Sequence, residues 1–246
     1  MRIILALLTV FLAGDAVAQA IDAPKEYRNC FILAHQKPEE GWEQALAWQS
    51  LGGGEPARHC GAVALISLGK YEEAAQRLEA LAAESRRVEA VRAEMLAQAG
   101  QAWLLAGKPE RALAAQETAL QMAPGTPDLL LDKAVTLAQV HHYKDAVAVL
   151  SEVLRRQPNR VEAMTLRASA HRYLDQIPLA KDDIARALVL DPGFPDALLE
   201  RGMLRRLDDD RIGARQDWLK VLELSHPDSA AAESARKNIE MMDVKK

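Results

Sequence analysis

Two cysteines, with a histidine beside one of them, are the side chains in this sequence best suited to covalent or metal chemistry. Cys30 and Cys60 are the two cysteines of the chain, and His59 directly precedes the second. Two thiols can form a disulfide, whereas two thiolates with His59 and His35 are a conceivable zinc ligand set. No C-x-x-C pair or His-x3-His spacing supports the zinc alternative, so the disulfide is favoured.

The other candidates for chemistry lie in predicted turns. His141 and His142 are adjacent, so their side chains point apart, and the run Asp208–Asp210 lacks the spacing of a calcium loop. Gly52–Gly54 is not followed by the Lys-Ser/Thr of a phosphate-binding loop. We assign no catalytic, cofactor-binding or metal-binding residue, and we expect a protein that is not an enzyme and uses no cofactor.

Small residues recur along the chain at a fixed step of 34 residues, and this period predicts the elements that position these side chains. A period of this length indicates a helical hairpin that is repeated and stacked on its neighbours. The sequence is also rich in Ala, Leu and Glu, which favour helix. We therefore expect an all-α fold. The small-residue columns are Ala112, Ala146, Ala180 and Ala214, preceded at 38 residues by Ala74, and Gly100, Ala134, Ala168 and Gly202.

The period divides the chain into units. Four extra residues around Arg87–Arg92 separate the first regular repeat from the second, and they account for the step of 38. The first helix of the second repeat is expected from about Ala93 to Leu105. The units are a degenerate N-terminal helical hairpin at 21–54, five repeats at 55–88, 93–126, 127–160, 161–194 and 195–228, and a capping helix with a tail at 229–246.

The turn between the two helices of each repeat carries a family resemblance. The stretch LGKYEEA at 68–74 and the stretch YKDA at 143–146 are similar to the inter-helix turn of tetratricopeptide repeats. The chain resembles that family over residues 55–228, although the aromatic positions of the pattern are kept only at Trp103 and Trp218. The resemblance implies a right-handed α-solenoid of stacked antiparallel helix hairpins.

The same resemblance implies a binding groove. In this family the first helices line the concave side, where exposed positions bind extended peptides or partner helices. Arg167, Arg201 and Arg205 are expected to add basic charge near the C-terminal end of the groove, while the Lys and Asn of the family's carboxylate-binding set have no match here. The expected partner-binding positions are Gln101, Leu104, Leu105, Leu131, Val135, Gln139, Ser169, Arg172, Tyr173, Leu199, Met203 and Arg206.

The N-terminus has the pattern of a secretory signal peptide. Met1 and Arg2 give a short positive start, an apolar run follows from Ile3 to Gly14, and small residues come next. We expect residues 1–20 to be a signal peptide, cleaved after Ala18 or Ala20. The apolar run is shorter than the roughly 20 residues that a spanning helix needs. We therefore expect a periplasmic or secreted protein that is not inserted in a membrane after cleavage.

Export and geometry together favour the pairing of the cysteines. An oxidising compartment permits disulfides. Cys30 and Cys60 also fall at similar heights on two predicted inner helices that are successive in the stack. We therefore expect a Cys30–Cys60 disulfide.

The net charge of the chain argues against nucleic acid as a partner. The net charge is -4, so nothing suggests a basic surface for nucleic acid. The sequence predicts a non-catalytic protein–protein interaction scaffold of the bacterial cell envelope, whose partner is a protein or peptide. The alternatives are a structural protein that self-associates as a homo-oligomer and, more remotely, an enzyme or small-ligand binder on a helical-repeat frame.

Overall fold

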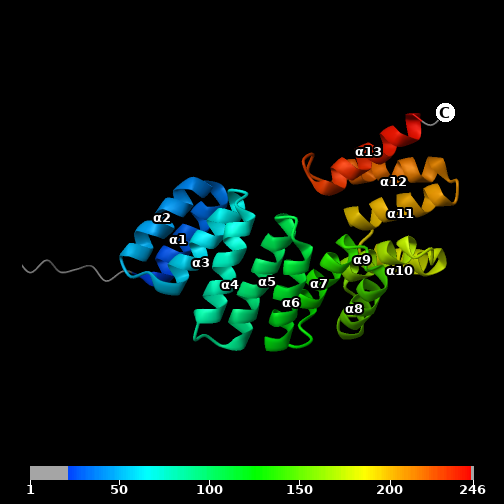
Figure 1. Cartoon of the computed structure of the whole chain (residues 1–246). Coiled ribbons are helices and arrows are strands. Elements are labelled where there is room, and N and C mark those ends of the chain that lie inside the picture. The colour runs from blue at the N-terminus through cyan, green and yellow to red at the C-terminus, as the bar shows by residue number, and fades with distance from the viewer. Residues whose placement is uncertain (1–21, 245–246) are drawn as a thin grey trace, which may run out of the picture.

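The computed structural model describes residues 22–244, and within that range it contains thirteen α-helices and no strand (Figure 1). The predicted signal peptide therefore lies outside the described residues. None of the described helices combines the length and the hydropathy that crossing a bilayer requires. The helices are α1 (Ala23–Gln36), α2 (Pro38–Ser50), α3 (Gly54–Ser67), α4 (Tyr71–Glu84), α5 (Glu89–Leu105), α6 (Pro109–Met122), α7 (Pro127–Gln139), α8 (Tyr143–Arg156), α9 (Val161–Tyr173), α10 (Ile177–Leu190), α11 (Pro195–Leu207), α12 (Arg211–Leu224) and α13 (Ala230–Val244).

The helices pair in chain order into hairpins, and the hairpins stack into a curved ribbon (Figure 1). The first helix of each hairpin packs on the second, and the second packs on the first helix of the next hairpin. The last helix, α13, covers α12 and α11 at the C-terminal end. The architecture is an all-α helical-repeat solenoid, as the 34-residue period predicts.

Small residues let the two helices of a hairpin approach each other. A Cβ atom added to Gly100 would lie 2.9 Å from Cγ of Gln116 on the partner helix. A Cβ added to Gly202 would collide with the ring of Trp218, at the equivalent place three hairpins further on. Because a larger side chain opposite either residue would push the helices apart, the glycines of this column are required by packing.

The turn inside each regular hairpin has one residue with a positive φ. Gly69 and Gly107 take this conformation in the N-terminal half, with φ values of 73° and 70°. His141, Asp175 and Asp209 take it further along, with φ values of 62°, 59° and 64°. A left-handed residue just after a helix lets the chain reverse and satisfies the last helical carbonyls. The C-terminal turns therefore use side chains that tolerate this conformation less well than glycine does.

One helix departs from the regular pattern. Helix α5 has 17 residues, whereas α7, α9 and α11 have 13 each. It begins at Glu89, so the expectation of a start near Ala93 was wrong by about one turn. The four residues that break the 34-residue period are absorbed as an added turn at the start of α5, following a short non-helical segment, 85–88.

The N-terminal hairpin is joined covalently to the next one. Cys30 on α1 and Cys60 on α3 form a disulfide, with their Cα atoms 6.2 Å apart. Both side chains are buried and pack with Ala34, Ala45 and Ala64. The disulfide expected from the sequence is therefore present, and the zinc alternative is excluded because the two thiols are consumed.

Candidate functional site

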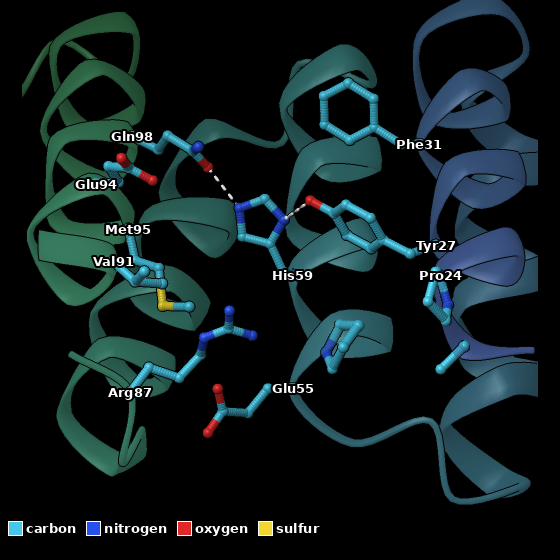
Figure 2. Close-up of a pocket in the computed structure, with 12 residues that line it drawn as sticks. Pro24, Tyr27, Phe31, Glu55, His59, Arg87, Val91, Glu94, Met95 and Gln98 are labelled. Carbon is cyan, nitrogen blue, oxygen red and sulfur yellow. Dashed lines mark hydrogen bonds between the residues drawn. The ribbon is translucent and has the colours of Figure 1, made fainter.

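A cavity opens at the N-terminal end of the face that the first helices form (Figure 2). It has a volume of about 570 Å³ and lies between α1, α3 and the start of α5. This volume is within the range of ligand sites in proteins. Apolar side chains form much of the lining, and polar groups enter from all three helices. The lining residues are Ala23, Pro24, Tyr27, Phe31, Glu55, Pro56, His59, Arg87, Val91, Glu94, Met95 and Gln98.

The cavity forms where the regular stacking is interrupted. Neighbouring first helices pack directly at α1–α3, α5–α7, α7–α9 and α9–α11, whereas α3 and α5 approach less closely. The step of 38 residues falls between α3 and α5. It also supplies part of the wall, because Val91 belongs to the added turn of α5, and Arg87 lies in the non-helical segment directly before that turn. The break in the period therefore creates the hollow and lines it.

His59 stands at the centre of a hydrogen-bond chain that crosses the cavity (Figure 2). Its Nδ1 lies 2.9 Å from the hydroxyl of Tyr27 on α1, and its Nε2 lies 2.8 Å from Oε1 of Gln98 on α5. An amide oxygen can only accept, so His59 Nε2–H donates to Gln98, and the Tyr27 hydroxyl donates to Nδ1. The ring is neutral in this arrangement, and the amide NH2 of Gln98 remains able to donate.

Burial sets the protonation of this chain. Burial lowers the pKa of His59, an effect that the hydrogen bond to Gln98 and the nearby Glu94 charge partly oppose. Burial also raises the pKa of the Tyr27 hydroxyl, which keeps it a donor. Both shifts favour the neutral forms that the hydrogen bonds require.

The disulfide fixes two walls of the cavity relative to each other. Tyr27 lies one helical turn before Cys30, and Phe31 directly follows it, while His59 directly precedes Cys60. The Tyr27–His59 hydrogen bond and the disulfide therefore link the same two helices, α1 and α3. Because α1 packs only within the N-terminal part of the solenoid, the covalent link restricts its movement away from α3.

The twelve groove positions expected from the sequence lie on α5, α7, α9 and α11, three on each helix, and none of them is buried. Leu105 and Tyr173 are more than half exposed, at 58% and 57%. Leu131, Leu199 and Met203 are partly covered by the core beneath them. These positions form a face that continues the wall of the cavity from α5 onward, and their role in binding remains a prediction.

The arginines near the C-terminal end of this face are engaged in ion pairs. Arg172 donates to both carboxylate oxygens of the buried Glu200, at 2.5 and 3.2 Å. Arg201 and Arg205 both bond to the buried Asp217. Arg167 is paired in the same way with Asp183. These contacts neutralise the basic charge that the sequence led us to expect at this end of the groove.

The sequence did not predict the cavity. His59 was considered only as a metal ligand, and the residues around 87–92 only as a spacer between repeats. Two signals pointed to this place: the single departure from the 34-residue period, and a histidine next to the cysteine that ties two inner helices together.

The fold and the cavity define a helical-repeat solenoid with an open first-helix face. Two family models, both described as tetratricopeptide repeat, match residues 61–127 and 104–170. The chain therefore contains tetratricopeptide repeats over residues 61–170. No curated protein sequence matches it.

Several solved structures share the fold, and two of the three described here are named as tetratricopeptide proteins. A tetratricopeptide repeat protein from Parabacteroides merdae ATCC 43184 matches with a TM-score of 0.70 and 14% identity, over 89% of this chain and 85% of that one. MamA, residues 41 to the end, from Desulfovibrio magneticus RS-1 matches with a TM-score of 0.58 and 24% identity, over 69% and 94%. YrrB, a tetratricopeptide protein described as having an unusual peptide-binding site, matches with a TM-score of 0.52 and 20% identity, over 78% and 96%. At these identities the likeness concerns the fold alone.

Proposed function

We propose that this protein is an exported, non-catalytic scaffold of the bacterial cell envelope that binds a segment of a partner protein along its first-helix face. The tetratricopeptide fold supports a protein–protein interaction scaffold, and proteins of this family are generally non-catalytic. The observation that carries the proposal is the cavity between α1, α3 and α5, which opens onto the same face as the twelve expected groove positions. The peptide-binding site named for YrrB supports the same kind of ligand.

Site-specific photocrosslinking in the native host tests the binding face. A photoreactive residue is placed at Leu105 or Gln139, which are exposed on first helices, and at Ile212, which is 76% exposed on the second helix α12. We expect one partner protein to be crosslinked from Leu105 and Gln139 and not from Ile212. Crosslinks from Ile212 alone, or none from any position, would overturn the proposal.

A charge placed on the same face provides the matching variants. Gln139→Arg puts a bulky cation on the first-helix face at an exposed position. Ile212→Arg puts the same group on α12, as the control. The crosslink from Leu105 is expected to weaken in the first variant and to persist in the second. An equal effect of both variants would argue against a binding site on the first helices.

Export is tested separately. The disulfide suits an oxidising compartment, and the N-terminal pattern is that of a cleaved leader. N-terminal sequencing of the protein from a periplasmic extract is expected to begin at Gln19 or Ile21. A chain that starts at Met1 and remains in the cytoplasmic fraction would contradict this part of the proposal.

Exposed apolar side chains favour self-association as a second candidate function. Val189 and Leu190 near the end of α10 are 81% and 45% exposed, and Leu179 on the same helix is about half exposed. Exposed apolar surface can mark an interface between proteins. Light scattering at tens of micromolar tests this candidate: a dimer that Val189→Lys converts to a monomer supports self-association, and a monomeric wild-type protein excludes it.

A further inference from the structure

Helix α10 has an outward face that differs from those of the other second helices. It packs on α9 and α11 and lies at the outer edge of the ribbon (Figure 1). Leu179 and Val189, on the side away from the core, are 52% and 81% exposed. The positions equivalent to Val189 on α6, α8 and α12 are polar or charged: Gln121, Arg155 and Glu223. The apolar residues on this face of α10 are therefore not required by the repeat.

Four exposed residues form a line along this face, which we call the α10 seam. The seam consists of Leu179, Asp182, Arg186 and Val189. They follow one another at steps of three, four and three residues. At 3.6 residues per turn, these steps keep the four side chains within an arc of about 80° on the helix surface, opposite the buried Ile184. The same spacing occurs where two helices pack side by side along their length.

The seam is complementary to itself when its direction is reversed. Leu179 and Val189 stand five positions before and after residue 184, and Asp182 and Arg186 stand two positions before and after it. When a two-fold axis relates two copies of a protein, contacts across the interface are reciprocal. An antiparallel pair of α10 helices centred at residue 184 therefore places Leu179 opposite Val189 of the second copy and Asp182 opposite Arg186 of the second copy. Apolar side chains meet at both ends, and opposite charges meet in the middle.

The two charged side chains of the seam are available for such pairing. Arg186 has one carboxylate at 4.0 Å, that of Asp183, which Arg167 holds more closely at 2.6 Å. Among the ion pairs of residues 22–244, none involves Asp182. Neither side chain therefore gives up a close ion pair when it meets a second copy. Charges of this kind fix the partner and the orientation of an interface more than they add affinity.

Two hollows beside the seam give room for the side chains of a second copy. One hollow, of about 440 Å³, lies between α10 and α11, and the other, of about 330 Å³, lies between α10 and the start of α9. Ala185 and Val189 line both hollows, and buried apolar side chains, Leu204 in the first and Met164 in the second, line them too. The Leu179 side chain of a second copy, which faces Val189, therefore has apolar surface to contact.

We propose that the α10 seam is the interface of a two-fold symmetric dimer of this protein, in which α10 packs antiparallel on α10 of a second copy. Leu179 and Val189 form the apolar ends of the interface, and Asp182 and Arg186 pair at its centre. The first-helix faces of both copies stay open, because α10 is a second helix, so the dimer presents two binding faces. This inference rests on self-association, the second candidate function, and specifies its interface.

Exchange of the two charges tests the direction and the register of the pairing. Asp182→Arg places an arginine opposite Arg186 of the second copy, and Arg186→Asp places two carboxylates face to face. Because like charges oppose association, and the two-fold axis makes each contact occur twice, each single variant is expected to raise the Kd of dimerisation at least tenfold in sedimentation equilibrium. The double variant Asp182→Arg/Arg186→Asp restores both pairs. Its Kd is expected to return to within about threefold of the wild-type value.

An equimolar mixture of the two single variants provides a second test. Opposite charges face each other again in the mixed dimer, so the mixture is expected to sediment as a dimer at concentrations where each variant alone is a monomer. Lys220→Asp is the matched control, because Lys220 is exposed and occupies on α12 the place of Arg186 on α10. It is expected to leave the Kd unchanged. Thermal unfolding of each variant checks that the fold is intact.

The outcomes separate this interface from self-association in general. The seam is short compared with interfaces that bury about 1,200–2,000 Å², so we expect a Kd on the order of 10 µM. A wild-type protein that is monomeric at tens of micromolar would overturn the α10 seam together with self-association. A dimer that the single variants leave intact, that the double variant does not restore, or that Lys220→Asp weakens equally would overturn the seam alone. The crosslinks from Leu105 and Gln139 test the first-helix face independently.

Discussion

The two ends of this solenoid are held together by different chemistry. At the N-terminal end, a disulfide and a hydrogen bond join α1 to α3, and the cavity separates α3 from α5. Near the C-terminal end, each of two hairpins is linked by an arginine on its first helix that pairs with a buried aspartate on its second. These pairs are Arg167–Asp183 and Arg201–Asp217, and both partners recur at a step of 34 residues.

The difference follows from the regularity of the repeat. Where the 34-residue period is kept, the same arginine–aspartate pair can link the two helices of successive hairpins. Where the period is broken, neighbouring first helices no longer pack closely, and a covalent link holds the outermost one. Four measurements test whether the two ends of the solenoid are stabilised in these different ways.

Removing the disulfide is expected to have the largest effect. The bridge closes a loop with a sequence separation of 30 residues, and its loss in Cys30→Ala/Cys60→Ala should lower the free energy of unfolding of the N-terminal region by about 3–4 kcal/mol. Hydrogen exchange should accelerate in α1, α2 and α3 and stay unchanged in α9–α12. A reducing agent should have no further effect on the double variant. Uniform loss of protection along the chain would contradict the comparison.

Breaking an ion pair at the other end should have the second largest effect. Asp217 is buried and accepts from Arg201 and Arg205, so Asp217→Asn weakens three charge-assisted hydrogen bonds. Both arginines are more than one-third exposed and can be rehydrated, so we expect a loss of about 2 kcal/mol in urea unfolding. Asp228→Asn, at a 91% exposed side chain, is the control. A loss no larger than that of the control would mean that the pair contributes little.

Acidification from pH 7.5 to 5.0 should destabilise the N-terminal end through His59. Burial lowers the pKa of His59 in the folded state, below the unfolded value of about 6.5. The unfolded chain therefore binds the proton at a higher pH than the folded protein does, so this contribution to stability is fully present above pH 6.5 and is lost as the pH falls through the lowered pKa of the folded state. This loss should be smaller in His59→Gln, measured by urea unfolding at pH 7.5 and 5.0. His226→Gln, at an exposed histidine, should behave as the wild type does.

The inter-helix turns should give the smallest effect. Asp209 and His141 hold positive φ angles that glycine adopts without strain, so Asp209→Gly or His141→Gly should stabilise the protein by about 0.5–1 kcal/mol. Gly69→Ala should destabilise the N-terminal turn by about 1 kcal/mol for the same reason. Melting temperatures that move in the opposite directions would show that these turns are held by their side chains. The hydrogen bond between His141 Nδ1 and the Tyr143 hydroxyl is the contact to examine in that case.

Much of the fold could be predicted from the sequence, because the period depends on local packing. The small residues at Gly100 and Gly202 mark the places where paired helices meet, and the prolines that open α6 and α7 mark helix starts. The disulfide was also predictable, since a stack of hairpins places Cys30 and Cys60 on neighbouring inner helices.

The candidate site was harder to predict, because its walls come from three helices and its shape depends on how far they part. The extra residues before α5 were visible as an irregular step, but a spacer loop and an added helical turn are equally compatible with four residues. The pairing of Arg172 with Glu200 was missed for a related reason. The two residues are 28 positions apart, and the packing of α11 against α9 brings them together.

The added turn of α5 makes one position along this solenoid different from the regular repeats that follow it. A surface built from equal units offers similar contacts at every step of 34 residues, and a bound chain could slip from one unit to the next. The cavity beside α3 occurs where the period is broken, so in the proposed scaffold one alignment alone would place a ligand residue in it. The irregularity occupies one helical turn, and the regular packing of the later hairpins is kept beside it.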